Sequence, residues 1–84
     1  MKGKTTTGFA FDIPDENFDM EFLDALADLT DDPVKMKEVL DRMFDGTDLK
    51  KRLYDHVRTE NGKVPPKAIA AEIAEIFKAM PKNS

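Results

Sequence analysis

The chain has one histidine, His56, in the stretch DHVRTENGKVPP, and this residue is the first candidate for catalysis or metal binding. A metal centre needs several ligands, and with no cysteine and no second histidine only carboxylates could complete one. No pairing of a nucleophile with a base is visible in the sequence. On a helix, His56 would have Arg52 and Glu60 as neighbours. We therefore interpret it as a surface histidine that pairs with Glu60.

Two acidic stretches could supply oxygen ligands for calcium, and both fail the spacing of an EF-hand loop. In DENFDM the first three ligand positions match, but Met20 stands where glycine is required and Leu26 where the bidentate glutamate is required. In DRMFDG, Met43 and Arg52 occupy ligand positions. No glycine-rich phosphate loop is present. We expect no enzymatic activity, no metal, no cofactor and no small-molecule substrate.

Most of the remaining chain has the apolar periodicity of amphipathic helices, which predicts a mainly α fold, a small bundle of about four helices. The apolar faces are formed in turn by Phe18, Phe22, Leu23, Leu26 and Leu29; by Met36, Val39, Leu40, Met43 and Phe44; by Leu49, Leu53 and Val57; and by Ile69, Ile73, Ile76, Phe77 and Met80. At 84 residues there is room for one small domain.

Helix ends are indicated by capping residues. We expect Asp15 to cap the first helix, Asp32 to cap the second before Pro33, and Thr47 to cap the third. Gly46 should end the second helix in a left-handed conformation. Asn61–Gly62 lies between two helical patterns and not between strands, so we interpret the stretch DHVRTENGKVPP as a helix–helix joint in which Gly62 stops one helix and Pro65–Pro66 begins the next.

The N-terminal residues follow a different pattern. Residues 1–8 are expected to form a flexible arm, and Phe9, Phe11 and Ile13 alternate with Ala10 and Asp12 as in a short half-buried strand. The predicted organisation is therefore an arm over 1–8, a single helical domain over 9–80 that begins with this extended segment, and a tail over 81–84.

Charge is distributed unevenly along the chain. Residues 1–49 contain 5 Lys or Arg against 13 Asp or Glu, and residues 50–84 contain 8 against 4. The two halves could complement each other within one fold, or they could attract opposite ends of neighbouring copies in a homo-oligomer. No apolar run approaches a membrane span, and Asp12 and Pro14 interrupt the N-terminal apolar stretch, so a soluble cytoplasmic protein is expected.

The order of these segments resembles the tail assembly chaperones of tailed bacteriophages and prophages of Gram-positive bacteria. The resemblance covers residues 9–80 and rests on FDIPDENFDMEFLDALADL, on DDPVKMKEVLDRMF with the short glycine turn after it, and on LKKRLYDHVRTENGKVPPKAIAAEIAEIFKAM. It implies a mainly helical protein that binds the tape measure protein, helps to recruit tail tube protein, acts in the host bacterial cytoplasm and is absent from the mature virion. Family members often occur as a short form and a frameshifted longer form.

For such a role we predict partner contact through Phe9, Phe11, Ile13, Met36, Met43 and Phe44, with the alternative that all six belong to the core. Two other interpretations stay open. A helix-turn-helix-like DNA-binding regulator could use Lys50, Lys51 and Arg52, although a sequence pI near 4.9 argues against nucleic acid as a partner. The other is a structural head–tail connector subunit.

Overall fold

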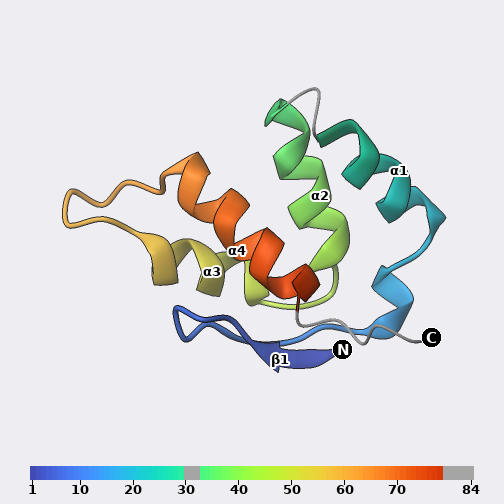
Figure 1. Ribbon diagram of the computed structural model, residues 1–84, viewed down its shortest axis with the longest axis horizontal. Helices are drawn as coiled ribbons and strands as arrows, with labels where there is room; N and C mark the ends of the chain where they lie inside the picture. The colour runs from blue at the N-terminus through green and yellow to red at the C-terminus, as the bar shows by residue number, and fades with distance from the viewer. Residues whose placement is uncertain (30–32, 79–84) are drawn as a thin grey trace. The chain divides into compact units, whose positions relative to one another are not determined.

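The computed structural model describes residues 1–29 and 33–78, and within them the protein is mainly helical with a short N-terminal sheet (Figure 1). In chain order the elements are β1 (Lys2–Lys4), β2 (Ala10–Asp12), the 3-10 turn η1 (Asp15–Asn17), α1 (Met20–Leu29), the 3-10 turn η2 (Pro33–Lys35), α2 (Met36–Met43), α3 (Leu49–Val57) and α4 (Pro66–Lys78). The predicted fold class, about four helices with an N-terminal extended segment, is confirmed. The cap predicted at Asp32 and the apolar position Met80 lie outside the described residues.

The chain divides into two compact units, and the boundary falls inside α3. One unit consists of Met1–Asp12 and the chain from Lys51 onward, and the other of Ile13–Lys50. The sequence predicts one domain over residues 9–80. The N-terminal segment joins the C-terminal helices because threonines near its turn bond to side chains of α3 and α4, 49 to 67 residues away in the chain.

A β-hairpin replaces the flexible arm expected over residues 1–8. β1 and β2 pair antiparallel with Gly3 opposite Phe11, and the backbone N–H of Thr5 donates to the carbonyl of Phe9 at 2.9 Å. The turn between the strands contains Gly8 at a φ of +95°. The strand predicted from the alternation over residues 9–13 is present at Ala10–Asp12, and residues 2–4 supply the partner that a single short strand lacks.

In the same unit, α3 and α4 are joined by the loop that the sequence predicts. Within it the N–H of Thr59 donates to the carbonyl of Lys63 at 2.8 Å, and the N–H of Gly62 donates to the carbonyl of Thr59 at 2.9 Å. Gly62 has a φ of +77° but lies five residues beyond the last residue of α3, so it serves the loop turn and does not stop the helix. Pro66 begins α4 as predicted. The buried side chains of α4 include Ile69, Ile73 and Ile76.

In the other unit, α1 and α2 pack together. Phe22 and Ala25 of α1 are buried, and Val39, Leu40 and Met43 of α2 are buried as well. The cap of α1 differs from the prediction: Oδ1 of Asp19 accepts from the N–H of Phe22 at 2.9 Å. Asp15 is the first residue of η1. It is too far from α1 to cap it, because the rest of η1, Phe18 and Asp19 lie between Asp15 and the start of α1 at Met20.

The end of α2 is held by a side chain from η1. Nδ2 of Asn17 donates to the carbonyls of Met43 and Asp45, both at 2.9 Å, and so satisfies the last carbonyl of α2 and one carbonyl of the turn that follows it. Gly46 has a φ of +76°, which confirms the left-handed position predicted there. Oγ1 of Thr47 accepts from the N–H of Leu49 at 3.1 Å, as expected for a residue that caps α3.

Candidate partner-binding surface

The six side chains predicted to contact a partner are distributed over both units, and five of them are buried. Phe9 and Phe11 belong to the unit that contains the hairpin, whereas Ile13, Met36, Met43 and Phe44 belong to the unit that contains α1 and α2. The exposed fractions are 4% for Phe9, 3% for Phe11, 0% for Ile13, 0% for Met43 and 3% for Phe44, and Met36 is half-buried.

This placement matches the alternative interpretation, in which these residues are core side chains. In the described conformation the five buried residues are not accessible to a partner. Apolar periodicity identifies which side chains are removed from water. It does not say whether the covering surface comes from the same chain or from another one.

The large apolar side chains that remain in water lie elsewhere in the α1–α2 unit. Met20 is 68% exposed and Leu23 is 47% exposed, both on α1, and Val34 in η2 is 81% exposed. Met20, Leu23 and the exposed Ala27 are spaced i, i+3 and i+7, so they share one side of the helix. Leu23 was predicted to widen the inner stripe of this helix, and that prediction is wrong because the buried side is defined by Phe22 and Ala25.

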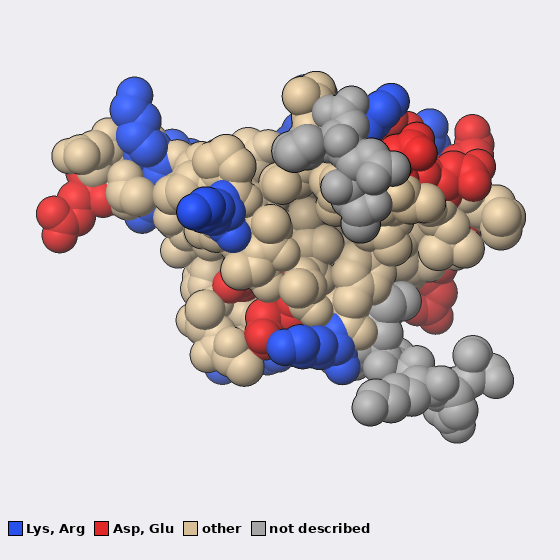
Figure 2. Space-filling view, turned by 45° about the horizontal axis from the view of Figure 1, so that its top comes forward, with Lys and Arg blue, Asp and Glu red and all other residues tan. Residues whose placement is uncertain are grey.

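Acidic side chains accompany this exposed row. α1 contains Glu21, Asp24 and Asp28 and no basic residue. At about 100° per residue these three form a second row beside Met20, Leu23 and Ala27. We call these six residues together the outer face of α1. In Figure 2, acidic side chains gather on the part of the surface that carries α1 and α2.

The positive charge nearest to this face is already committed to acidic partners. Nε of Arg42 donates to Oε2 of Glu38 at 3.1 Å, and this bond is the main reason that the pKa of the guanidinium is raised. The charges of Glu21 and Asp19 raise it further. Within residues 1–29 and 33–78, neither Asp24 nor Asp28 has an ion-pair partner.

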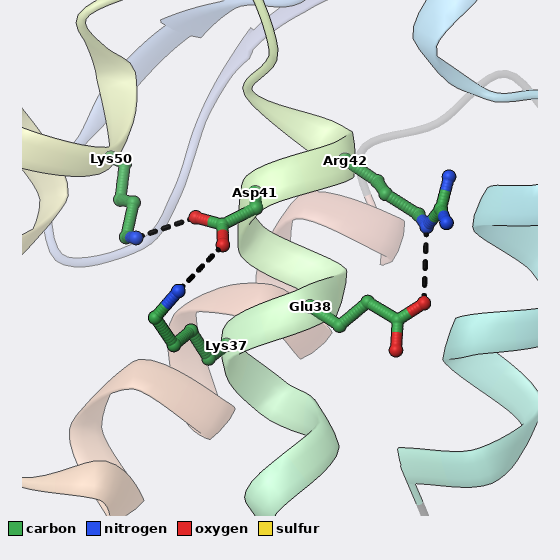
Figure 3. A network of polar contacts seen from close by, with 5 residues as sticks. All are labelled: Lys37, Glu38, Asp41, Arg42 and Lys50. Atoms are coloured by element: carbon green, nitrogen blue, oxygen red, sulfur yellow. Dashed lines mark hydrogen bonds and ion pairs between the residues drawn. The ribbon is translucent and has the colours of Figure 1, made fainter.

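A second group of charges joins α2 to the start of α3 (Figure 3). The carboxylate of Asp41 accepts from Nζ of Lys37 at 3.0 Å and from Nζ of Lys50. These bonds, that from Lys50 first, hold the pKa of Asp41 below its usual value. Lys50 is the first residue of the basic stretch Lys50–Arg52 that was considered for DNA contact. Its ammonium group is already bonded to Asp41 of the same unit.

His56 and the buried Glu72 belong to one polar network in the other unit. Glu72 is 2% exposed, and its carboxylate accepts from Oγ1 of Thr5 and from Oγ1 of Thr7, each at 2.8 Å. His56 lies 2.9 Å from Oγ1 of Thr7 through Nε2, and its ring stands 5.5 Å from that of Phe9. The predicted pairing of His56 with Glu60 is therefore replaced by contacts to the hairpin.

The proton positions in this network argue against a nucleophile activated by a base. Both hydroxyl groups donate to the carboxylate of Glu72, so the oxygen of Thr7 can only accept a hydrogen bond from the N–H at Nε2 of His56. A base would need the reverse arrangement, in which the hydroxyl donates to the imidazole. The network therefore fastens the hairpin to α3 and α4. In the described part of the chain, no group of three histidine, cysteine or acidic side chains is placed to hold a metal ion.

The sequence pattern did contain a signal for Met20 and Leu23. α1 carries apolar residues on more than one side, because Met20, Leu23 and Ala27 lie opposite Phe22 and Ala25. Such a helix has more apolar surface than one neighbour can cover.

Over the described ranges, no helix is long and apolar enough to span a membrane.

Comparison with known proteins gives no relative from which a function could be transferred: no family model matches the chain, and neither a curated protein nor a solved structure matches it significantly.

Proposed function

We propose that this protein is a non-catalytic tail assembly chaperone of a phage or prophage, which binds the tape measure protein and helps to recruit tail tube protein. The observation that carries the proposal is the exposure of Met20 and Leu23 on an acid-rich helix. Large apolar side chains gathered on one side of a small protein are typical of a surface that meets a partner. The resemblance over residues 9–80 supplies the identity of that partner.

The proposed action needs only reversible coverage of apolar surface. A tape measure protein is a long helical rod that aggregates when its apolar side chains meet water, and a small acidic protein bound along it would shield them and add repulsive charge. Tail tube protein would then displace the chaperone. The protein would act in the host bacterial cytoplasm and be absent from finished virions.

Two competing roles make different demands on the molecule. A DNA-binding regulator would need free basic side chains, yet Lys50 is bonded to Asp41, and Arg58 is paired with Asp55 at 3.1 Å. A head–tail connector subunit would stay in the finished particle. The experiment that follows separates both from the chaperone.

The test is co-expression with the tape measure protein of the phage or prophage that encodes this chain. We expect the soluble fraction of the tape measure protein to rise and the two proteins to co-purify, and we expect mass spectrometry of purified virions to find no copy of the chain. The variant Met20→Glu/Leu23→Glu should lose this effect. Ala70→Glu/Ala74→Glu adds the same charge at exposed positions of α4 and should keep it.

Three results would contradict the proposal. A folded wild-type protein that leaves the tape measure protein insoluble excludes the chaperone role. Copies of the chain retained in purified virions would indicate a connector. Salt-sensitive binding to DNA that depends on Lys51 and Arg52 would indicate a regulator.

A further inference from the structure

We infer that the outer face of α1 is a docking surface for one basic amphipathic helix of a partner protein. The inference deepens the proposed function and rests on it for the view that the chain is a binding protein. Beyond the proposed function, it identifies the binding surface on this protein and the chemistry of the partner segment that binds there. The six residues named above carry it.

The outer face presents two parallel rows with different chemistry. The apolar row runs from Met20 through Leu23 to Ala27, and the acidic row runs from Glu21 through Asp24 to Asp28. Each row spans eight residues, and the seven steps between its ends correspond to about 10 Å of helix. The two rows lie side by side because their members follow each other by one residue, about 100° around the axis.

The complementary ligand can be described from these rows. It is a helix of at least two turns with apolar residues at i, i+3 or i+4, and i+7, and with Lys or Arg on the adjoining row at the same spacing. The apolar row would exclude water, and the acidic row would set orientation and reject acidic helices. Met20 is unbranched and flexible, so the surface tolerates different apolar residues in the ligand.

A second copy of this chain fits the outer face less well. The exposed side of α4 carries alanines with Lys67 and Lys78 at its ends, and these lysines are eleven residues apart, about 16 Å, against about 10 Å for the acidic row. On α3 the exposed Lys51 and Arg52 are followed by the acidic Asp55. Charge complementarity therefore favours a helix from another protein.

The test uses three designed peptides of equal length as probes. One is an amphipathic helix with leucines on one side and lysines on the adjoining row, the second has glutamate in place of every lysine, and the third contains the residues of the first in scrambled order. Binding to the full chain is measured by fluorescence anisotropy. We expect the amphipathic lysine peptide to bind, and to bind at least about tenfold more tightly than either of the others.

The decisive comparison is between two variants that carry the same added charge. Met20→Glu/Leu23→Glu makes the outer face more acidic but removes its apolar row, so binding should weaken about tenfold or more. Ala70→Glu/Ala74→Glu should bind the peptide as well as wild type or more tightly. If attraction were only electrostatic, both variants would bind more tightly, and that result would overturn the inference.

Amide chemical shifts of the wild-type protein provide a readout that does not depend on variants. On titration with the lysine peptide, the shifts should concentrate in residues 20–28. Shifts confined to other residues, or no binding at all, would overturn the inference. So would self-association that Met20→Glu/Leu23→Glu abolishes and that the peptide reverses, because the occupant would then be a second copy.

The two proposals can fail separately. If the tape measure protein is solubilised but the outer face of α1 does not bind the peptide, the function stands and the surface is wrong. If the peptide binds at the outer face but the tape measure protein stays insoluble, the surface stands and the partner is a different protein.

Discussion

The side chain that holds the N-terminal hairpin in place is Glu72. It is one of two buried polar residues in the described part of the chain, and the other, Thr5, is its hydrogen-bond donor. A buried carboxylate is tolerated only when its oxygens have partners, and here two hydroxyl groups supply them. Glu72 follows Ile69 by three residues and precedes Ile76 by four, so it lies beside the buried isoleucines of α4.

We predict that Glu72→Gln lowers the free energy of unfolding by about 1–2 kcal/mol. The amide keeps one acceptor oxygen but turns an NH2 group toward one of the threonines, which exchanges a charge-assisted bond for a weaker one. Urea unfolding followed by circular dichroism measures the loss. Glu75→Gln is the control on the same helix. Glu75 accepts an exposed N–H from Thr6 at 3.2 Å, and this bond lowers its pKa, so its replacement should lower the midpoint too, but by less than replacement of the buried Glu72. Equal losses in both variants would contradict the assignment.

Asp41 makes folding stability depend on pH. Its pKa is lowered in the folded protein, chiefly by the bond from Lys50 and then by that from Lys37. The folded state therefore binds a proton less readily than the unfolded state, so this contribution is complete above the ordinary value of 3.8 and is lost as pH falls through the lowered pKa.

Two lysine variants test the order of these causes. We predict that Lys50→Met raises the pKa of Asp41 more than Lys37→Met does, because the Lys50 bond is the larger cause. Titration of the carboxyl carbon by NMR measures both values. A larger effect from Lys37→Met would contradict the geometry in Figure 3, where both ammonium groups meet the same carboxylate.

Among the secondary-structure elements, the hairpin contains a close steric contact at Gly3. Gly3 stands opposite Phe11, and a Cβ atom at Gly3 would lie 2.8 Å from Cζ of that ring. Phe11 is 3% exposed, so its ring cannot move without disturbing buried neighbours. A glycine is needed at position 3 because the ring of Phe11 leaves no room for a Cβ atom.

We predict that Gly3→Ala destabilises the protein by about 1–2 kcal/mol. In an unhindered strand the same change would stabilise, because alanine has less backbone freedom to lose on folding. The sign of the change therefore identifies the cause. Thermal unfolding of Gly3→Ala should show a lower midpoint than wild type, whereas Lys4→Ala, on the same strand and exposed, should stay close to it. A higher midpoint for Gly3→Ala would show that the ring has room.

The elements also show how far sequence reasoning reaches. The four helices, the strand at residues 10–12 and the left-handed Gly46 follow from local spacing and residue type, and the sequence predicts all of them. The cap of α1 does not follow, because several acids precede the helix and only the 3-10 turn decides that Asp19 is the cap. The hairpin does not follow either, because the bonds from Thr5 and Thr7 to Glu72 span 67 and 65 residues.

The residues predicted to contact a partner and the apolar residues that remain exposed differ for a related reason. Phe9, Phe11 and Ile13 have the alternation of a strand that buries one side, and that pattern is the same whether the cover is intramolecular or a partner. The periodicity places Leu23 on the same apolar face as Phe22 and Leu26. Only the packing of α1 on α2 shows which side of α1 remains in water.

At the scale of the whole molecule, charge is the property that the fold leaves unbalanced. The net charge of the chain is −4, but residues 1–49 have 5 basic against 13 acidic side chains and residues 50–84 have 8 against 4. Exposed lysines such as Lys51 and Lys67 contribute to the basic half. Copies of such a chain attract each other when acidic and basic regions meet, and the attraction weakens with salt.

We therefore predict weak self-association at low ionic strength that disappears at high ionic strength. Between 0.01 M and 1 M salt the screening length falls from about 30 Å to about 3 Å, so sedimentation velocity should change from a concentration-dependent to a monomeric profile. Lys51→Glu/Lys67→Glu removes the positive balance of residues 50–84 and should abolish the association at low salt. Lys35→Glu/Lys37→Glu changes the net charge by the same amount but lies in the other unit, so it leaves the basic region intact and should preserve the association. If both variants lose the association, the change in net charge is the cause, and the uneven distribution of charge along the chain has no role.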